Sequence, residues 1–348
     1  MALICESVAT RLALNFKVTL FFNTDNKMQL KTTPIKLFSV LGALAFAAVA
    51  QADEPVTPPI PGVSAGGVVI ELIKDGFKGT EGPIGYTDGS LLFTETNANR
   101  IVRIAPDNTV TTFLEDSNGA NGLALNAAGE LYAAQTLKPQ VGVIYPVDKK
   151  KTLAENFEGV PFQRPNDIVI DKSGGVYFTD SGTRPTKDAP NPPPSHPGLF
   201  YVTPVGELKR LANDIDRPNG VQLSKDEKVL YVANTLGEHV LAYDVAADGS
   251  ISNKRKFARL DGWKNEDNAW SSGADGLAID DNDRLYVASN SGIEVFTSQG
   301  DALGIIPLPQ KPQNIAFAGT DKKTLYAVGR GSAYKIPLIA QGFKGRAK

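Results

Sequence analysis

The sequence predicts an all-β protein with the architecture of a six-bladed β-propeller. The first observation is an internal repeat, in which an oxygen-bearing residue precedes a short apolar strand, a turn, and a second apolar strand that carries an aromatic residue. The six pairs are Glu81 with Phe93, Asn121 with Tyr132, Asn166 with Tyr177, Asn219 with Tyr231, Asp275 with Tyr286, and Asn314 with Tyr326. The members of each pair lie 11 or 12 positions apart, which fits one hairpin geometry with a variable turn.

The second observation is the distance between successive copies of this repeat. The polar residues lie 40, 45, 53, 56 and 39 positions apart. Each interval is long enough for four strands, and two of the intervals leave room for an inserted loop. This repeat length is typical of the blades of a propeller. No helical stretch of comparable strength interrupts the pattern.

Residues 1–52 are expected to be a secretory signal peptide with extra sequence upstream. Two lysines follow Met28, then comes the apolar run Leu37–Val49, and an A-x-A motif ends at Ala52. The run is too short to span a membrane, so the pattern predicts cleavage after Ala52 and a periplasmic or secreted protein. An uncleaved membrane anchor is the alternative. Cleavage would also remove Cys5, the only cysteine, and with it any disulfide or thiol nucleophile.

The stretch before the first repeat has two parts. Residues 53–67 are rich in proline and glycine and are expected to be a tether or a disordered leader. The β-like run Val68–Ile73 has no hairpin partner of its own, so we expect it to close the ring by pairing with the C-terminal strands of the last blade. The propeller is therefore expected over 68–343, and a C-terminal tail over 344–348.

Each blade is then completed by its own outer strands. Blades one and two are completed by RIVRIAP and VTTFLED, and by VGVIYPV and the stretch around KTLAENF. Blade three is interrupted by the insertion Thr183–Gly198 before LFYVTP and GELKRLAN, and blade four ends in a second insertion, Leu260–Gly273. Blade five continues through GIEVFTSQG and blade six through AYKIPLI.

The charge of the chain excludes one class of partner. The chain has 38 acidic and 36 basic residues, and its sequence contains no stripe of basic residues. It therefore lacks the positive charge pattern that is typical of nucleic-acid binding. Residues 1–52 hold five of the basic and two of the acidic residues, which leaves the expected mature chain with a net charge near −5. We expect a small-molecule partner, no stable membrane insertion of the mature chain, and a monomer or weak dimer.

The six polar residues that open the repeats are the candidate site. The first strand of each propeller blade lines the central channel, so these residues are expected to converge at its mouth. For any single position an ordinary turn residue is the alternative, but glutamate is a poor turn residue and Glu81 occupies the same slot. A ring of carbonyl and carboxylate oxygens, with no nitrogen or sulfur donor, suits a hard cation, and calcium fits it better than zinc.

Four motifs in this order and spacing resemble the family of gluconolactonase, senescence marker protein and luciferin-regenerating enzyme. They are TEGP at Thr80–Pro83, RPND at Arg164–Asp167, RPNG at Arg217–Gly220, and ADG at Ala274–Gly276. The resemblance covers essentially the whole expected mature chain. It implies a lactone hydrolase with one divalent metal ion, usually Ca²⁺, bound by Glu81, Asn166, Asn219 and Asp275.

The same resemblance implies roles for individual residues. Asp275 is implied as a catalytic base as well as a metal ligand, and Arg164 as a substrate-binding residue. Asn166 contacts substrate instead of metal in some members of the family. The repeat, with weaker support, adds Asn121 as a substrate-binding candidate and Asn314 as a further member of the ring. Asp167 would orient water or bind sugar hydroxyls, and the alternative is a turn residue behind the site.

The expected chemistry is metal-assisted ester hydrolysis, in which the cation polarises the lactone carbonyl and Asp275 takes a proton from the attacking water. His196 and His239, the only histidines, are expected at the surface, and the sequence contains no G-x-S-x-G motif for a serine nucleophile. Related calcium propellers of the paraoxonase type carry a histidine near the metal, where this chain has Asn121. That difference disfavours aryl ester or phosphotriester hydrolysis.

Two further readings remain beside the lactonase. A calcium-bound propeller that binds a ligand or protein without catalysis is the main alternative, because fold does not fix function. A propeller like strictosidine synthase is disfavoured by the calcium-ligand set. The loop that carries Trp263 and Trp270 is either a sugar-stacking lid or a hydrophobic cover for loop edges.

Overall fold

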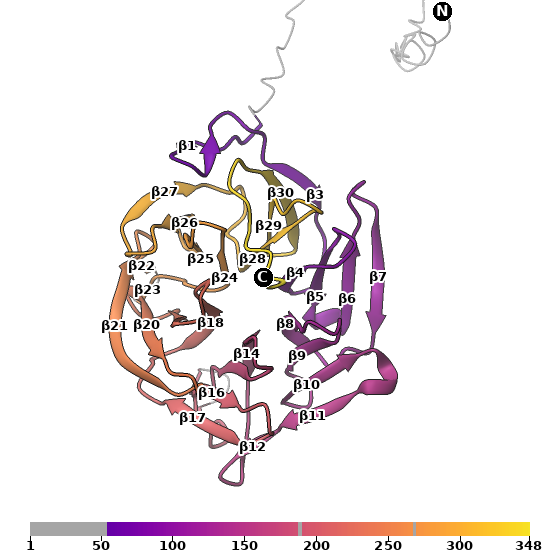
Figure 1. Cartoon of the computed structure of the whole chain (residues 1–348), viewed down its shortest axis with the longest axis vertical. Coiled ribbons are helices and arrows are strands. Elements are labelled where there is room, and N and C mark those ends of the chain that lie inside the picture. Colours follow the sequence, from indigo (N-terminus) through magenta and orange to yellow (C-terminus); the bar gives the residue numbers. More distant parts are fainter. Residues whose placement is uncertain (1–53, 187–189, 267–268) are drawn as a thin grey trace, which may run out of the picture. The chain divides into compact units, whose positions relative to one another are not determined.

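The computed structural model describes residues 54–186, 190–266 and 269–348. The expected signal peptide and its cleavage site lie outside the described residues. Figure 1 shows the sheets arranged like blades around a central axis, which confirms the predicted six-bladed propeller. Helical structure in the described part of the chain consists of two 3-10 turns, η1 (Thr96–Ala98) and η2 (Val147–Lys149).

Every blade is a four-stranded antiparallel sheet, and in each the first strand is innermost. Blade one is β4 (Thr80–Gly85), β5 (Leu91–Glu95), β6 (Arg100–Ile104) and β7 (Val110–Glu115). Blade two is β8 (Ala120–Leu125), β9 (Leu131–Gln135), β10 (Gln140–Tyr145) and β11 (Lys151–Ala154). Blade three is β14 (Pro165–Ile170), β15 (Val176–Asp180), β16 (Gly198–Val202) and β17 (Leu208–Ala212), after the short pair β12 (Asn156–Phe157) and β13 (Val160–Pro161).

The second half of the chain repeats this order. Blade four is β18 (Pro218–Leu223), β19 (Val229–Asn234), β20 (His239–Val245) and β21 (Ile251–Arg259). Blade five is β24 (Leu277–Ile279), β25 (Leu285–Ser289), β26 (Gly292–Phe296) and β27 (Ala302–Ile306), and the hairpin of β22 (Lys264–Glu266) and β23 (Ala269–Ser271) precedes it. Blade six is β28 (Asn314–Ala318), β29 (Thr324–Gly329), β30 (Ser332–Pro337) and β3 (Glu71–Lys74).

The ring is closed by the first part of the chain, as expected. Strand β3 pairs antiparallel with β30, with Leu72 opposite Tyr334. The closing strand is shorter than the predicted run Val68–Ile73, because regular pairing starts at Glu71. This closure pairs the backbone edge that the last blade would otherwise expose.

The stretch expected as a tether, 53–67, instead contains an ordered hairpin over its described residues. Strand β1 (Pro59–Ile60) pairs with β2 (Ser64–Ala65), and the side chains of Ile60 and Val63 are buried. The backbone of Val63 accepts hydrogen bonds from Ile339 N and Ala340 N, at 3.1 and 3.2 Å. Two apolar side chains in contact with distant strands therefore order a stretch whose composition alone suggested a leader.

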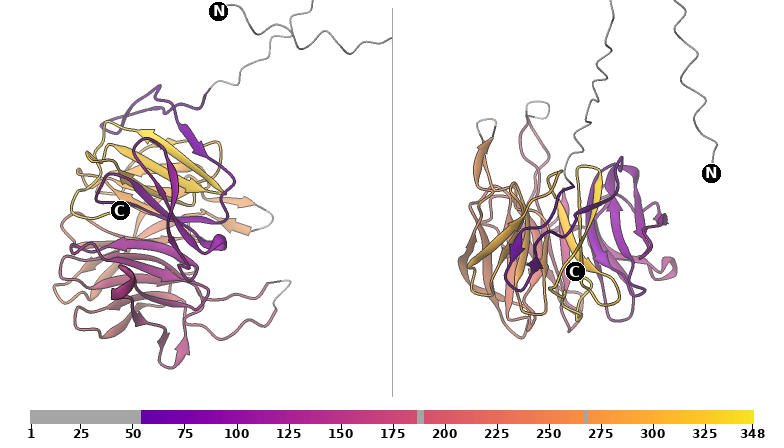
Figure 2. Two further views of the ribbon diagram at one scale, coloured as in Figure 1. Left: turned by 90° about the vertical axis from the view of Figure 1, so that its right-hand side faces the viewer. Right: turned by 90° about the horizontal axis from the view of Figure 1, so that it is seen from above.

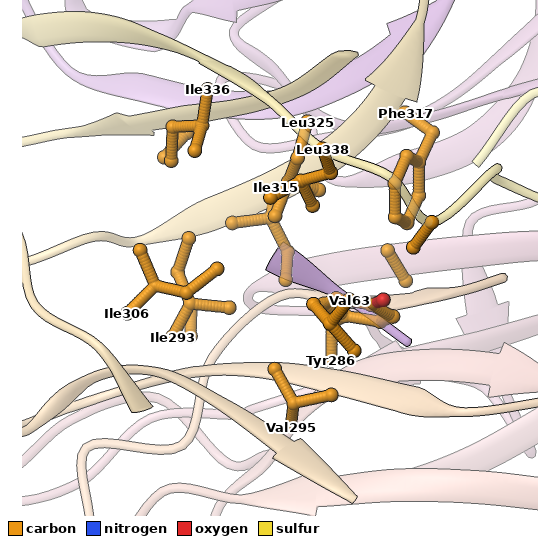
Figure 3. Close-up of a cluster of buried hydrophobic side chains, with 14 of the residues drawn as sticks. Val63, Tyr286, Ile293, Val295, Ile306, Ile315, Phe317, Leu325, Ile336 and Leu338 are labelled. Carbon is orange, nitrogen blue, oxygen red and sulfur yellow. The ribbon is translucent and has the colours of Figure 1, made fainter. Parts of the chain in front are cut away.

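The hydrophobic core lies between neighbouring blades. Figure 3 shows one such cluster, where Tyr286, Ile293 and Val295 of blade five face Ile315 and Phe317 of blade six, with Val63 among them. The repeated aromatic of the second strand belongs to these interfaces: Phe93, Tyr177, Tyr231, Tyr286 and Tyr326 are buried and Tyr132 is partly buried. Burial of each of these large side chains contributes on the order of 2 kcal/mol, so the repeated aromatic links adjacent blades.

The two faces of the ring differ. In both views of Figure 2 the strands β22 and β23 and the described parts of the long connection from β15 to β16 extend from one face, and the C-terminal end of the chain lies on the other. The first strands also begin on the face of these insertions, since Pro165 of β14 pairs with Asp180 at the end of β15. Over the residues that are described, no helix is long and apolar enough to cross a bilayer.

Candidate active site

The polar residues that open the repeats lie at corresponding places in the six blades. Glu81, Asn121, Asn166 and Asn219 are each the second residue of the innermost strand of their blade, and Asn314 is the first residue of β28. Asp275 precedes β24 by two residues, but its amide still donates to Ala288 O, at 2.9 Å. The blade symmetry therefore places all six at one end of the propeller axis, as the repeat predicted. We call them the axial ring.

The pairing of the first hairpin is irregular at the ring residue in four blades. The register of the first hairpin shifts between Glu81 and Ile84, between Ala120 and Leu123, between Pro165 and Ile168, and between Pro218 and Val221. Bulges of this kind re-aim side chains and are common beside functional sites. Here the irregularity recurs at the same place, so the backbone at the ring residue departs from regular pairing in all four of these blades.

Glycine allows adjacent blades to meet closely at the ring. A Cβ on Gly82 would lie 1.9 Å from Asn121 O, and a Cβ on Gly220 would lie 2.1 Å from Asp275 O. In both cases the neighbour is backbone, which no side-chain rotation can move. The glycine that follows the ring residue therefore determines how near the next ring residue can come.

Several ring oxygens are buried without a hydrogen-bond partner. Among the described residues, such orphan oxygens include Asn121 Oδ1, Asn219 Oδ1 and Asp275 Oδ1. The amide of Asn219 is oriented by its nitrogen, which donates to Thr235 Oγ1 at 2.9 Å, and Thr235 in turn donates to Ala274 O at 2.8 Å. Buried hydrogen-bond acceptors without partners are rare, because each one costs free energy. Three of them in one ring therefore indicate that the ring binds a ligand, such as a cation, that interacts with oxygen atoms.

Both carboxyl groups of the axial ring lie in surroundings that disfavour their charged form. Burial raises the pKa of Glu81 to about 7, although its Oε1 and Oε2 accept from Gln313 Nε2 at 3.1 Å and Asn314 Nδ2 at 3.4 Å. Burial also raises the pKa of Asp275 well above its ordinary value, and the negative charge of Glu81 adds to the effect. A cation between them would remove this penalty.

The donor set fits a divalent cation of the calcium type. Carboxylate and amide oxygens surround the axis, and hard cations such as Ca²⁺ take six to eight oxygen ligands of this kind. Over residues 54–186, 190–266 and 269–348, no group of three or more His, Cys, Asp or Glu side chains forms a metal site, so a zinc-like cluster is not found there. Glu81, Asn166, Asn219 and Asp275 are the residues that would hold the cation.

Asp167 differs from its neighbour Asn166. Its carboxylate is fully buried, Oδ2 accepts from Val221 N at 3.0 Å, and the same oxygen pairs with the ammonium of Lys348. Its Oδ1 has no partner in the described part of the chain. The predicted substrate-binding role of Asp167 therefore competes with an ion pair that the sequence did not suggest.

Basic side chains stand at the entrance to the ring. Arg164, the predicted substrate-binding residue, is exposed, and its amide donates to Asp180 Oδ1 at 2.8 Å. Burial lowers the pKa of the partly buried Arg217, and the positive charge of Arg164 lowers it further. Arg217 was not predicted, but a signal was present: it lies two positions before Asn219, as Arg164 lies two positions before Asn166.

The insertions and histidines occupy other places. The rings of Trp263 and Trp270 stack with their centroids 5.2 Å apart, and Trp270 is 55% exposed at the hairpin β22–β23. His239 faces Glu238, 3.7 Å from its carboxylate, and His196 contacts the ring of Phe157. The stacked tryptophans remain compatible with either a lid or a cover for the loop.

The raised pKa of Glu81 predicts a pH effect that a cation reverses. The folded protein without cation binds this proton more tightly than the unfolded chain, where the pKa is near 4.5. The stabilisation is therefore present below pH 4.5 and is lost as pH rises through about 7. We expect the Tm in chelator to fall across this window and the affinity for Ca²⁺ to rise, by up to about tenfold per pH unit for each proton released. Thermal denaturation and calorimetry from pH 5 to 8 measure both, and parallel Tm profiles with and without Ca²⁺ would contradict the expectation.

Comparison with known proteins agrees with this geometry. Residues 79–329 match the family described as the SMP-30/Gluconolactonase/LRE-like region. A gluconolactonase of Zymomonas mobilis is 28% identical over 277 residues, which are 74% of this chain and 78% of the relative, and rabbit regucalcin is 29% identical over 68% of this chain and 78% of its own length. The solved structure of a gluconolactonase from Xanthomonas campestris superposes with a TM-score of 0.68 at 26% identity, covering 78% of this chain and 90% of that one. The chain belongs to the SMP-30/gluconolactonase/LRE-like family.

Proposed function

We propose that the protein is a lactone hydrolase that opens a sugar lactone to the aldonic acid with the help of one divalent cation, Ca²⁺ in the first instance. The observation that carries the proposal is the set of orphan oxygens at the axial ring, within a chain whose relatives include a gluconolactonase. Three unpaired oxygens and two buried carboxyls in one ring cost free energy unless a ligand compensates them. This arrangement is explained by a cation and a polar substrate.

Each part of the site has a task in this reaction. Glu81, Asn166, Asn219 and Asp275 hold the cation, which when bound supplies a Lewis acid for the lactone carbonyl. Asp275 also accepts the proton of the attacking water, for which its unpaired Oδ1 is suited. Asn121, and the mouth arginine Arg164, bind the hydroxyl and ring oxygens of the sugar.

The cellular setting is part of the proposal. The leader pattern that ends at Ala52 favours export, so the substrate would be a lactone formed outside the cytoplasm, with glucono-1,5-lactone as the first candidate. A monomer or weak dimer suffices, because one chain supplies all six ring residues.

The test is hydrolysis of glucono-1,5-lactone, followed by proton release after subtraction of the spontaneous rate. We expect turnover with Ca²⁺, loss of turnover after treatment with chelator, and recovery when Ca²⁺ is restored. Manganese and zinc are added in parallel to identify the preferred ion. Tight Ca²⁺ binding without turnover on a panel of aldonolactones would contradict the enzyme and favour the non-catalytic binding propeller.

A further inference from the structure

The end of the chain is fixed across the face opposite the axial ring. From Gln341 to Lys348 it crosses the ends of several innermost strands, with Phe343 N donating to Ile279 O at 3.3 Å and Gly85 N donating to Ala347 O at 2.8 Å. Figure 1 shows this end of the chain close to the propeller axis. These contacts attach the segment to blades five and one, on opposite sides of its path.

Arg346 anchors the segment to a third blade. Its Nη2 donates to Leu223 O at 2.6 Å and Ser224 O at 2.8 Å, and its Nη1 pairs with Glu227 at 3.1 Å. The guanidinium also lies over the ring of Phe343, 4.9 Å from its centroid. With its position fixed by carbonyls at the end of β18, Arg346 directs the last two residues toward the axis.

Lys348 is thereby buried beneath the ring. Its side chain is 4% exposed, its ammonium pairs with Asp167 Oδ2, and its main-chain oxygen accepts from Gln222 Nε2 at 3.3 Å. Asp167 itself is fully buried and adjoins Asn166 of the axial ring. The ammonium therefore reaches the axis from the face opposite the mouth.

The ion pair belongs to the electrostatics of the site. Asp167 is the residue after Asn166 of the axial ring, and its Oδ2 also accepts from Val221 N, two residues after Asn219, at 3.0 Å. A buried carboxylate without a partner costs several kcal/mol, so Asp167 is tolerated where it is because Lys348 compensates it. The compensating charge has the same sign as a divalent cation.

We propose that Lys348 is an internal counter-cation of the axial ring: it neutralises the charge of Asp167 from the closed face and so weakens the binding of the divalent cation. This inference rests on the proposed cation site. Lys348 is a positioning residue, since it touches Asp167 and not the reacting atoms. A moderated affinity leaves the cation free to share its coordination with substrate.

Calorimetric titration with CaCl₂ tests the inference directly. The variants are Lys348→Met, which removes the charge at similar volume, and Lys344→Met, a matched control on an exposed residue of the same segment. We expect Lys348→Met to bind Ca²⁺ at least about tenfold more tightly, because a like charge has been removed from a site of low dielectric. Lys344→Met should bind as the unaltered protein does.

Thermal denaturation gives the second measurement, which does not depend on catalysis. In chelator, Lys348→Met should melt below the unaltered protein, and Ca²⁺ should raise its Tm by more. The double variant Asp167→Asn with Lys348→Met removes both charges and should recover the Tm in chelator and an affinity near the original. If Lys348→Met does not fold, Lys348→Gln provides the titration, because glutamine removes the charge and keeps a hydrogen-bond donor for Asp167.

The outcomes separate the two proposals. Equal affinity for Ca²⁺ in Lys348→Met and the unaltered protein overturns the counter-cation role and leaves the lactonase intact. A double variant that fails to restore the affinity overturns it as well. An unaltered protein that does not bind Ca²⁺ at all overturns the cation site and this inference together.

Discussion

Replacement of Asp275 by asparagine is expected to lower kcat for lactone hydrolysis by about a hundredfold to ten-thousandfold, the range that a general base contributes. Asparagine retains the shape of the side chain and one oxygen for the cation, but it cannot accept the proton of the attacking water. Ca²⁺ affinity should therefore fall much less than kcat. Steady-state kinetics with saturating Ca²⁺, together with calorimetric titration, separates the two effects.

The matched control is Asp301→Asn in the same blade, where the aspartate is exposed at the turn before β27. It removes the same charge without touching the ring, so kcat should stay within a factor of about two. If Asp275→Asn retained near-normal kcat with bound Ca²⁺, another group would have to be the base.

Replacement of Gly220 by alanine is expected to damage the site through the backbone. The new Cβ would lie 2.1 Å from the carbonyl oxygen of Asp275, so blades four and five must separate. Overpacking of this kind costs about 1–3 kcal/mol, and a displacement of about 1 Å at a catalytic group costs on the order of a hundredfold in rate. Urea denaturation and kcat on the same preparation measure both losses.

Gly129→Ala gives the generic cost of adding a methyl group to a glycine of this fold. Gly129 has a φ of +78° and no atom within 4 Å of the added Cβ, so the loss there is conformational and should leave kcat unchanged. A Gly220→Ala protein with stability and kcat like those of Gly129→Ala would show that the blades yield at no functional cost.

The fold could be predicted from the sequence because each blade is formed by residues that are close together in the chain. The interval of 11 or 12 residues between ring residue and aromatic reflects one hairpin, and its six copies define the blades wherever the loops vary. The closing strand was predictable for a related reason, since a lone β-like run needs an edge to pair with. The convergence of the ring followed from the symmetry of the repeat.

The rest depends on contacts that no local pattern records. Ile60 and Val63 are apolar residues in a stretch rich in proline and glycine, and only the strands packed against them make that stretch a hairpin. Lys348 meets Asp167 across 181 positions of sequence, where no repeat relates them. The irregular pairing at the ring residues likewise belongs to the backbone register, which the spacing of side chains in the sequence does not show.

The ring closes at a seam between blade six and blade one, and this seam forms late in folding. Glu81 belongs to the first blade and Asn314 to the last, and they meet through a contact of 3.4 Å between Asn314 Nδ2 and Glu81 Oε2. The seam forms only when β3 pairs with β30, after nearly the whole propeller has been synthesised. A cation bound by Glu81 of blade one and Asp275 of blade five would span this seam, so an occupied site would also resist opening of the ring.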